Sequence, residues 1–125
     1  MAMVFISHDL GAVSAICDRA AVMYAGRIVE QANTNDLFRA PMHPYTRGLF
    51  DAIPDLDADR ARLLPIEGTV PDPKALPAGC AFAPRCARAS AFCAAHQPDL
   101  KPQPQGGEVS CFHPITLPQR QKAIA

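Results

Sequence analysis

Four cysteines between residues 80 and 111 are the most reactive set of side chains in the chain. They are Cys80, Cys86, Cys93 and Cys111, spaced C-x5-C-x6-C-x17-C. Thiolates bind soft metal ions and iron–sulfur clusters, and pairs of thiols form disulfides. Structural zinc sites usually take cysteines in pairs about two to four residues apart, which neither short interval matches. The wider spacing favours an iron–sulfur cluster, with zinc and metal-free thiols, reduced or disulfide-linked, as the alternatives.

The charged residues around the cysteines also favour an iron–sulfur cluster. Between Pro73 and Pro98 the charged residues are Lys74, Arg85 and Arg88, with no carboxylate. Nearby cations favour thiolates, so we expect this segment to offset the negative charge of a cluster. His96 and His113 are weaker candidates, since four cysteines already complete the ligand count of a cluster. Cys17, by contrast, is expected to be a small buried hydrophobic residue.

His8 is the second candidate for chemistry. It follows an apolar run without alternation, which predicts a strand over residues 3–6 buried on both faces of a parallel sheet. Ligands of such sheets bind at the carboxyl ends of the strands, so we expect His8 to face a ligand rather than to be structural. Asp9 is expected to cap a helix whose apolar face includes Leu10, Val13 and Ile16.

The elements that follow are short. Residues 20–24 and 27–31 are expected to form a hairpin around Ala25-Gly26. Thr34 is expected to cap a helix through residues 35–39. A second helix is expected over residues 45–53, after prolines 41 and 44 end the first. His43 is expected to make loop hydrogen bonds, and Tyr45, Phe82 and Phe92 to pack.

Proline content divides the chain, because all 13 prolines fall between residues 41 and 118. Residues 54–77 carry five of them, together with Asp55, Asp57 and Asp59, which predicts an extended, solvated connector. The 12 basic and 12 acidic residues argue against a general nucleic-acid or polybasic membrane surface. No apolar run approaches the roughly 20 residues that span a bilayer, and no signal peptide is evident.

Several motifs together resemble a known family. Residues 4–10 (VFISHDL), 18–19 (DR) and 22–30 (VMYAGRIVE) resemble the end of an ABC-transporter ATPase, in which His8 matches the H-loop switch histidine. Residues 41–49 (PMHPYTRGL) resemble the His-Pro-Tyr segment of the oligopeptide, dipeptide and nickel importer ATPases. Residues 66–71 and 76–80 continue this pattern, and the resemblance extends to about Pro114.

The resemblance implies an α/β fold: the C-terminal piece of a P-loop ABC nucleotide-binding domain, followed by an irregular, proline-rich, cysteine-containing extension. Residues 1–53 would be the end of the nucleotide-binding domain, 54–79 a connector, 80–114 the C-terminal cysteine loop of oligopeptide transporters, and 115–125 a tail. The resemblance also implies a four-iron four-sulfur cluster, because the cysteines match a loop that is associated with such a cluster in this family. It further implies a location in the reducing cytosol, where disulfides rarely persist, so disulfides are a weaker expectation.

The resemblance further implies an ATP-binding subunit of a peptide importer that couples ATP hydrolysis to uptake. It would bind ATP and Mg²⁺, with His8 at the γ-phosphate. Its partners would be a second ATPase subunit, membrane permeases and, indirectly, a peptide-binding protein, at the inner face of the cell membrane. Nucleic acid is not an expected partner.

The sequence departs from the family in lacking a Gly-rich phosphate loop, the strand that ends in a catalytic glutamate, and the ABC signature. Because phosphoryl transfer depends on these groups together, the chain alone is expected not to hydrolyse ATP. We therefore expect a C-terminal fragment. The alternatives are a stand-alone iron–sulfur or zinc module with a structural or redox role, and a nonfunctional truncated remnant.

Overall fold

The computed structural model describes residues 2–52, 66, 68–104 and 106–115 of the 125 residues. Its helices are α1 (Leu10–Ile16), α2 (Thr34–Arg39), α3 (Pro44–Asp51) and α4 (Ala91–Ala95), with a 3-10 turn at Ala83–Arg85. Its strands are β1 (Arg19–Tyr24), β2 (Arg27–Asn33), β3 (Lys101–Pro102) and β4 (Glu108–Val109). None of the helices in these described ranges is long and apolar enough to cross a membrane.

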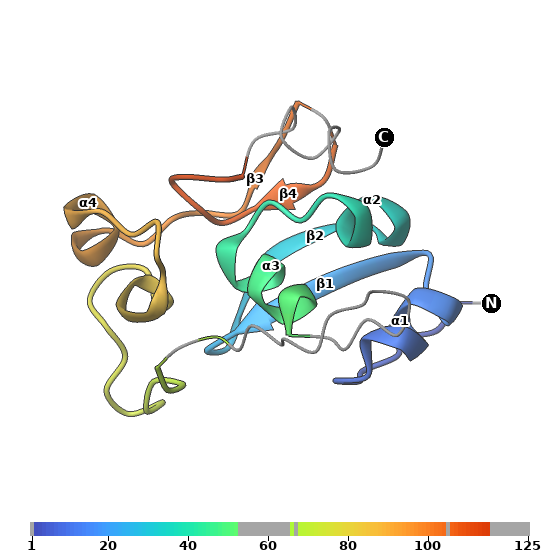
Figure 1. Cartoon of the computed structure of the whole chain (residues 1–125), viewed down its shortest axis with the longest axis horizontal. Helices are drawn as coiled ribbons and strands as arrows, with labels where there is room; N and C mark the ends of the chain where they lie inside the picture. Colours follow the sequence, from blue (N-terminus) through green and yellow to red (C-terminus); the bar gives the residue numbers. More distant parts are fainter. Residues whose placement is uncertain (1, 53–65, 67, 105, 116–125) are drawn as a thin grey trace, which may run out of the picture.

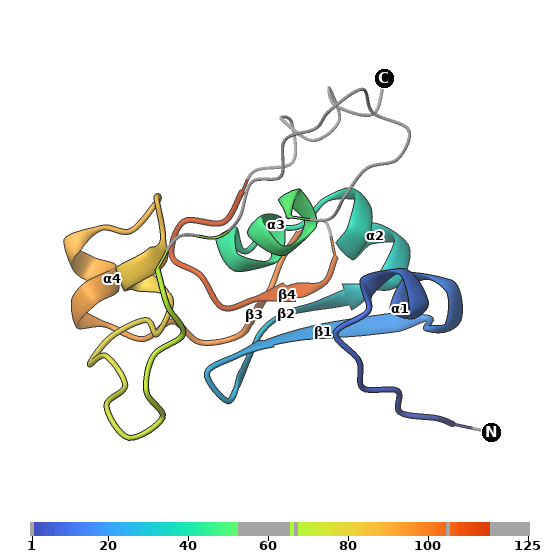
Figure 2. The same ribbon diagram turned by 60° about the horizontal axis from the view of Figure 1, so that its bottom comes forward.

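The four strands form one antiparallel sheet in the order β1-β2-β4-β3 (Figure 1). Figure 2 shows α2 and α3 together over one face of the sheet, with α1 and α4 at opposite ends of the molecule. The structure is thus a mixture of helices and antiparallel sheet. It contains no parallel strand pair within the described residues.

The predicted hairpin is confirmed. Strands β1 and β2 meet at Ala25 and Gly26, whose φ angles of 51° and 81° are both positive. Two consecutive positive φ angles give the primed turn that matches the twist of a two-stranded ribbon. The helix after residue 9 is also confirmed, with Asp9 accepting a hydrogen bond from the Ala12 amide.

The predicted buried strand at residues 3–6 is wrong for this structure. The segment has no regular secondary structure, and the side chains of Val4 and Ile6 are 87% and 92% exposed. A strand needs neighbours to satisfy its backbone groups and cover its side chains. No strand of the described sheet pairs with residues 3–6, so their apolar side chains remain at the surface.

The start of α2 also differs from the prediction. Asn33, and not Thr34, caps the helix, because its side-chain oxygen accepts a hydrogen bond from the Asn35 amide at 3.0 Å. Thr34 is buried as the first helical residue. The second helix is confirmed as α3, although Ile53, its predicted last residue, lies outside the described residues. So does most of the predicted connector; the described residues between 66 and 77 form no helix or strand.

A β-bulge in the hairpin places two consecutive side chains in the interior. Val22 pairs with Glu30, while the next residue, Met23, pairs with Ile28, so Val29 is the extra residue on β2. Strand side chains normally alternate between faces, and a bulge breaks this alternation. Val29 and Glu30 are therefore both buried, at 7% and 0% exposed.

Val29 belongs to an aromatic core that joins the hairpin to the cysteine segment. Tyr24, Tyr45 and Phe82 come from β1, α3 and the loop before the 3-10 turn, and their ring centroids are 4.6 to 5.4 Å apart. These separations are typical of favourable aromatic pairs. Packing of Tyr45 and Phe82 is thus confirmed, and the two halves of the chain share one core.

Candidate functional site

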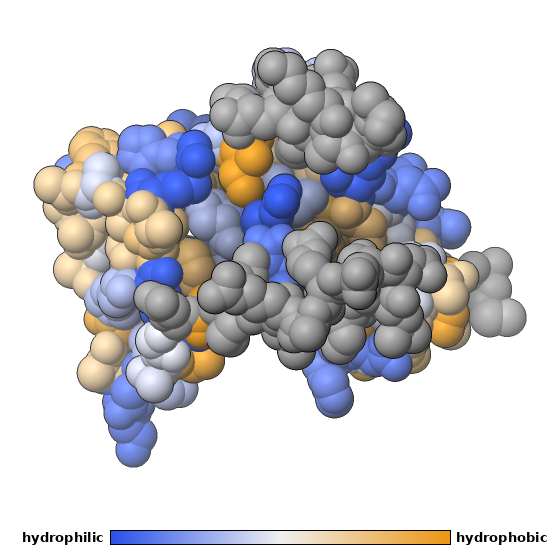
Figure 3. Space-filling model, in the orientation of Figure 1, coloured by the Kyte–Doolittle hydropathy of each residue, from blue (hydrophilic) through white to orange (hydrophobic). Residues whose placement is uncertain are grey.

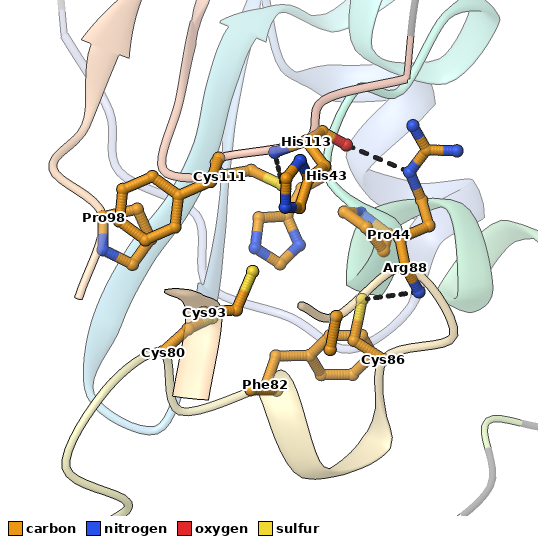
Figure 4. A pocket seen from close by; sticks show the side chains of 13 residues that line it. His43, Pro44, Cys80, Phe82, Cys86, Arg88, Cys93, Pro98, Cys111 and His113 are labelled. Atoms are coloured by element: carbon orange, nitrogen blue, oxygen red, sulfur yellow. Dashed lines mark hydrogen bonds between the residues drawn. The ribbon is translucent and has the colours of Figure 1, made fainter. Parts of the chain in front are cut away.

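The four predicted cysteines line one cavity at the end of the molecule that carries α4 (Figure 4). Cys80 and Cys86 flank the 3-10 turn, Cys93 lies in α4, and Cys111 follows β4. The surface of the cavity is almost entirely apolar. Its lining also includes His43, Phe82, Pro98 and His113. In the space-filling view, apolar residues are also frequent over this end of the molecule (Figure 3).

Main-chain contacts bring the cysteine segments together. The Cys80 amide donates a hydrogen bond to the Cys93 carbonyl at 2.8 Å. Gly79 permits this approach, because a Cβ atom at that position would lie 2.4 Å from the Cys93 carbonyl oxygen. Cys111 is brought in by the sheet, since the Ser110 amide donates to the Val29 carbonyl at 2.8 Å.

Three of the sulfur atoms have hydrogen-bonding neighbours. The Arg88 amide donates to Cys86 Sγ and the His113 amide donates to Cys111 Sγ, each at 3.3 Å. Ser90 Oγ lies 3.4 Å from Cys93 Sγ. Arg88 also reaches across the cavity mouth, donating from Nε to the His113 carbonyl at 3.0 Å. Donors aimed at sulfur stabilise negative charge on a thiolate or on a cluster.

The electrostatics differ from the prediction that nearby cations favour thiolates. Burial raises the pKa of Cys111 to about 11 and raises the pKa of Cys86 as well, and neighbouring thiols contribute in the same direction. The charge of Arg88 has the smallest of the effects on Cys86, smaller than the hydrogen bond from the Arg88 amide, and the Arg85 side chain donates to Tyr24 Oη at 3.2 Å. Desolvation outweighs the cations, so both thiols are protonated at neutral pH without metal.

The cavity contains no ready-made site for a single metal ion. Within the described ranges, no three histidine, cysteine, aspartate or glutamate side chains are close enough together to hold one ion. A mononuclear zinc site needs its sulfur atoms about 2.3 Å from the same ion, and therefore close to each other. The cavity volume is about 20 Å³, room for about one water molecule. The thiols converge, but a metal centre would require them to move.

His43 is the residue of the site whose importance sequence reasoning missed. It was expected only to make loop hydrogen bonds, yet it is 2% exposed and its ring lies 5.8 Å from that of Phe82. Its Nδ1 accepts a hydrogen bond from the Tyr45 amide at 3.0 Å and so caps α3. Burial lowers its pKa to about 4. A neutral imidazole therefore forms part of the cavity wall at pH 7.

Glu30 fixes the backbone of the segment that carries His43. Its two carboxylate oxygens accept hydrogen bonds from the Met42 and His43 amides, each at 2.8 Å. Sequence alone did not predict this, because burial of two consecutive side chains departs from the alternation of a regular strand. The bulge at Val29 allows Val29 and Glu30 both to be buried.

His8 lies far from the cysteine cavity. It is exposed and immediately precedes Asp9, the cap of α1, at the opposite end of the molecule from α4 (Figure 1). Cys17 ends α1 and lies outside the cavity, partly exposed rather than buried as expected. Of the two weaker candidates, His113 lines the cavity and His96 is exposed, stacked on Phe92. The structure thus brings the four cysteines together and leaves His8 apart.

Comparison with known proteins defines the class. The family model described as the oligopeptide/dipeptide transporter C-terminal region matches residues 29–93, from the bulge on β2 to the third cysteine of the cavity. The chain belongs to this family.

Particular relatives extend the match over most of the chain. The oligopeptide transport ATP-binding protein AppD of Bacillus subtilis is 48% identical over 110 residues, which are 88% of this chain and 34% of AppD. The oligopeptide transport ATP-binding protein OppD of Salmonella typhimurium is 44% identical over 114 residues, 91% of this chain and 34% of OppD. OppD of Escherichia coli is likewise 44% identical over 114 residues. The chain spans about a third of the length of these relatives.

Proposed function

We propose that this chain is part of the ATP-binding subunit of a peptide-importing ABC transporter. The observation that carries the proposal is the family match over residues 29–93 together with 44–48% identity to oligopeptide transport ATP-binding proteins. That identity extends over 88–91% of the chain. A stand-alone cysteine module would not account for so long a match, so it is not favoured.

In this proposal residues 1–53 close a nucleotide-binding domain, and His8 is its switch histidine. An imidazole at the γ-phosphate can position the attacking water and stabilise charge during phosphoryl transfer. The exposure of His8 is consistent with that role, because its side chain is free to meet groups from outside the described residues. The exposed apolar residues 3–6 would then be covered by neighbouring strands of the complete domain.

The partners and location follow from the same proposal. Hydrolysis of ATP with Mg²⁺ would take place between this subunit and a second ATPase subunit, and would drive peptide uptake through membrane permeases. The subunit would then lie at the inner face of the cell membrane. The cysteine segment, which shares the aromatic core with the hairpin, would move with the nucleotide domain as one body.

A chimaera tests the proposal. We expect that replacing the matching 114 residues of Escherichia coli OppD by this chain preserves uptake of a labelled peptide in cells. His8→Ala in the chimaera should reduce uptake about 100-fold or more, as expected for loss of a group that acts on the transition state. The matched control is Ser14→Ala, on the exposed surface of α1.

Two results would contradict the proposal. One is a chimaera that assembles in the membrane but transports nothing. The other is full uptake with His8→Ala.

The isolated 125-residue chain should show no ATPase activity above background, because it lacks the phosphate loop.

We further propose that Cys80, Cys86, Cys93 and Cys111 are ligands of a four-iron four-sulfur cluster. Two features support this: four thiols converge on one apolar cavity, and backbone amides donate to two of the sulfurs. In a cuboidal cluster each thiolate binds a different iron, which suits separated sulfurs better than zinc does. Such a cluster would supply a redox-active centre that also cross-links the four segments.

The cluster is tested by reconstitution. After anaerobic incubation of the purified chain with iron and sulfide, we expect a brown, oxygen-sensitive product with about four irons per chain. Cys86→Ser should remove most of the colour, whereas Cys17→Ser, outside the cavity, should not. A colourless product that retains zinc would contradict the assignment. Equal iron content in Cys86→Ser and Cys17→Ser would also contradict it.

A further inference from the structure

The backbone around the cavity singles out one pair among the four cysteines. Within the described residues, Cys80 and Cys93 are the two that share a direct main-chain hydrogen bond, at 2.8 Å. The covalent bonds on either side of this hydrogen bond keep the two Cα atoms within about 7 Å of each other. Disulfides span Cα separations of about 4.4–6.8 Å. The backbone of this pair therefore lies within the reach of a disulfide.

The surroundings hold these two segments in contact. The Gly79 Cα lies so close to α4 that an added Cβ would be 2.4 Å from the Cys93 carbonyl oxygen and 2.6 Å from the Ala94 carbonyl carbon. Both side chains line the same cavity. The sulfurs of Cys86 and Cys111 accept from the amide two residues further on, and the Cys93 sulfur lies 3.4 Å from Ser90 Oγ.

We propose that Cys80 and Cys93 form a reversible disulfide in the metal-free chain, with a low-molecular-weight disulfide such as glutathione disulfide as the oxidant. The inference does not require the cluster, because it concerns the chain before metal is bound. It does predict competition, since the same two sulfurs cannot bind iron while they are bonded to each other.

The reaction balances as two thiol–disulfide exchanges. The Cys80 thiolate, which is partly exposed, attacks one sulfur of glutathione disulfide and releases one glutathione thiol. The buried Cys93 thiolate then attacks Cys80 Sγ in the mixed disulfide and releases the second. Two protein thiols lose two electrons and two protons, and one glutathione disulfide becomes two thiols.

Peptide mapping tests the proposal on the full chain. The chain is stripped of metal with a chelator, equilibrated with glutathione redox buffers, alkylated and digested with trypsin without reduction. Cys80 lies on the tryptic peptide 75–85 and Cys86 on 86–88, while Cys93 and Cys111 share 89–120 because Lys101 precedes Pro102. We expect peptide 75–85 linked to 89–120, with fragment ions placing the bond at Cys93.

Variants separate the competing pairs. The link should persist in Cys111→Ser and Cys86→Ser, and it should be lost in Cys93→Ser and Cys80→Ser. In concentrated urea the unfolded chain should instead favour Cys80–Cys86, the pair with the shortest loop. Near-ultraviolet circular dichroism shows which variants remain folded, and the fragment ions of the unmutated chain locate the bond without any variant.

Three outcomes would overturn the inference. They are a link that survives in Cys93→Ser, a bond at Cys111 or Cys86 in the folded chain, and glutathione adducts without an internal disulfide. Failure here would leave the transporter assignment untouched, because the chimaera measures uptake.

Discussion

Acidification from pH 7 to pH 4 should lower the free energy of unfolding of the chain by about 3 kcal/mol through His43 alone. The His43 pKa is lowered by burial from 6.5 to about 4 in the folded state. Above pH 6.5 the imidazole is neutral in both states, and the stability is fully present. As the pH falls through 6.5 and towards 4, the unfolded chain takes up the proton first, so stability is lost. Urea unfolding at pH 7, 5.5 and 4, followed by near-ultraviolet circular dichroism, measures the slope.

His43→Asn isolates this contribution. Asparagine can still cap α3 by accepting from the Tyr45 amide, but it does not titrate. The variant should be less stable at pH 7, because it loses packing against Phe82, yet its stability should decline less with acid. His96→Asn, at an exposed site, should keep the full slope. An unchanged slope in His43→Asn would show that other groups cause the acid sensitivity.

Glu30→Ala should destabilise the chain by about 4 kcal/mol at pH 7, because it leaves the buried Met42 and His43 amides without their acceptors. Glu30→Gln should cost about half as much, since its amide oxygen can still accept one of the two bonds. Equilibrium unfolding in urea gives both values. The smaller change in Glu30→Gln keeps the measurement accessible if the alanine variant does not fold.

Glu108→Gln is the matched control for Glu30. Glu108 accepts from Gln31 Nε2 at a partly buried position on the neighbouring strand, and a glutamine oxygen can replace that acceptor. We expect a loss below about 1 kcal/mol. If Glu30→Ala and Glu108→Gln cost the same, the carboxylate of Glu30 does not hold the His-Pro-Tyr segment as the structure indicates.

Local signals in the sequence predicted the local structure well. The Ala25-Gly26 turn, the Asp9 cap and the helix that begins at Pro44 each depend on residues within a few positions, and the structure contains all three. The packing of Tyr45 and Phe82 was also predicted. Local hydrogen bonds and turn conformations can be read from neighbouring residues, because these residues alone determine them.

Features that depend on distant groups could not be read in this way. The apolar pattern of residues 3–6 was typical of a buried strand, but a strand forms only beside a partner. The burial of Val29 and Glu30 together depends on a bulge, and the high pKa of Cys111 depends on how deeply the folded chain buries it. The convergence of the cysteines was predicted from their types and spacing, whereas the raised pKa values of Cys86 and Cys111 were not.

The pairing of β2 with β4 has a consequence for the order in which the molecule assembles. Glu30 pairs with Val109, which is 79 residues further along the chain (109 − 30), so this contact closes a long loop, and closing long loops is slow in folding. Cys111 follows that strand directly. During synthesis the hairpin, α2 and α3 can fold as they emerge, but the fourth wall of the cavity arrives only with β4. The four thiols that we propose as cluster ligands are therefore all in place only after the rest of this region has folded.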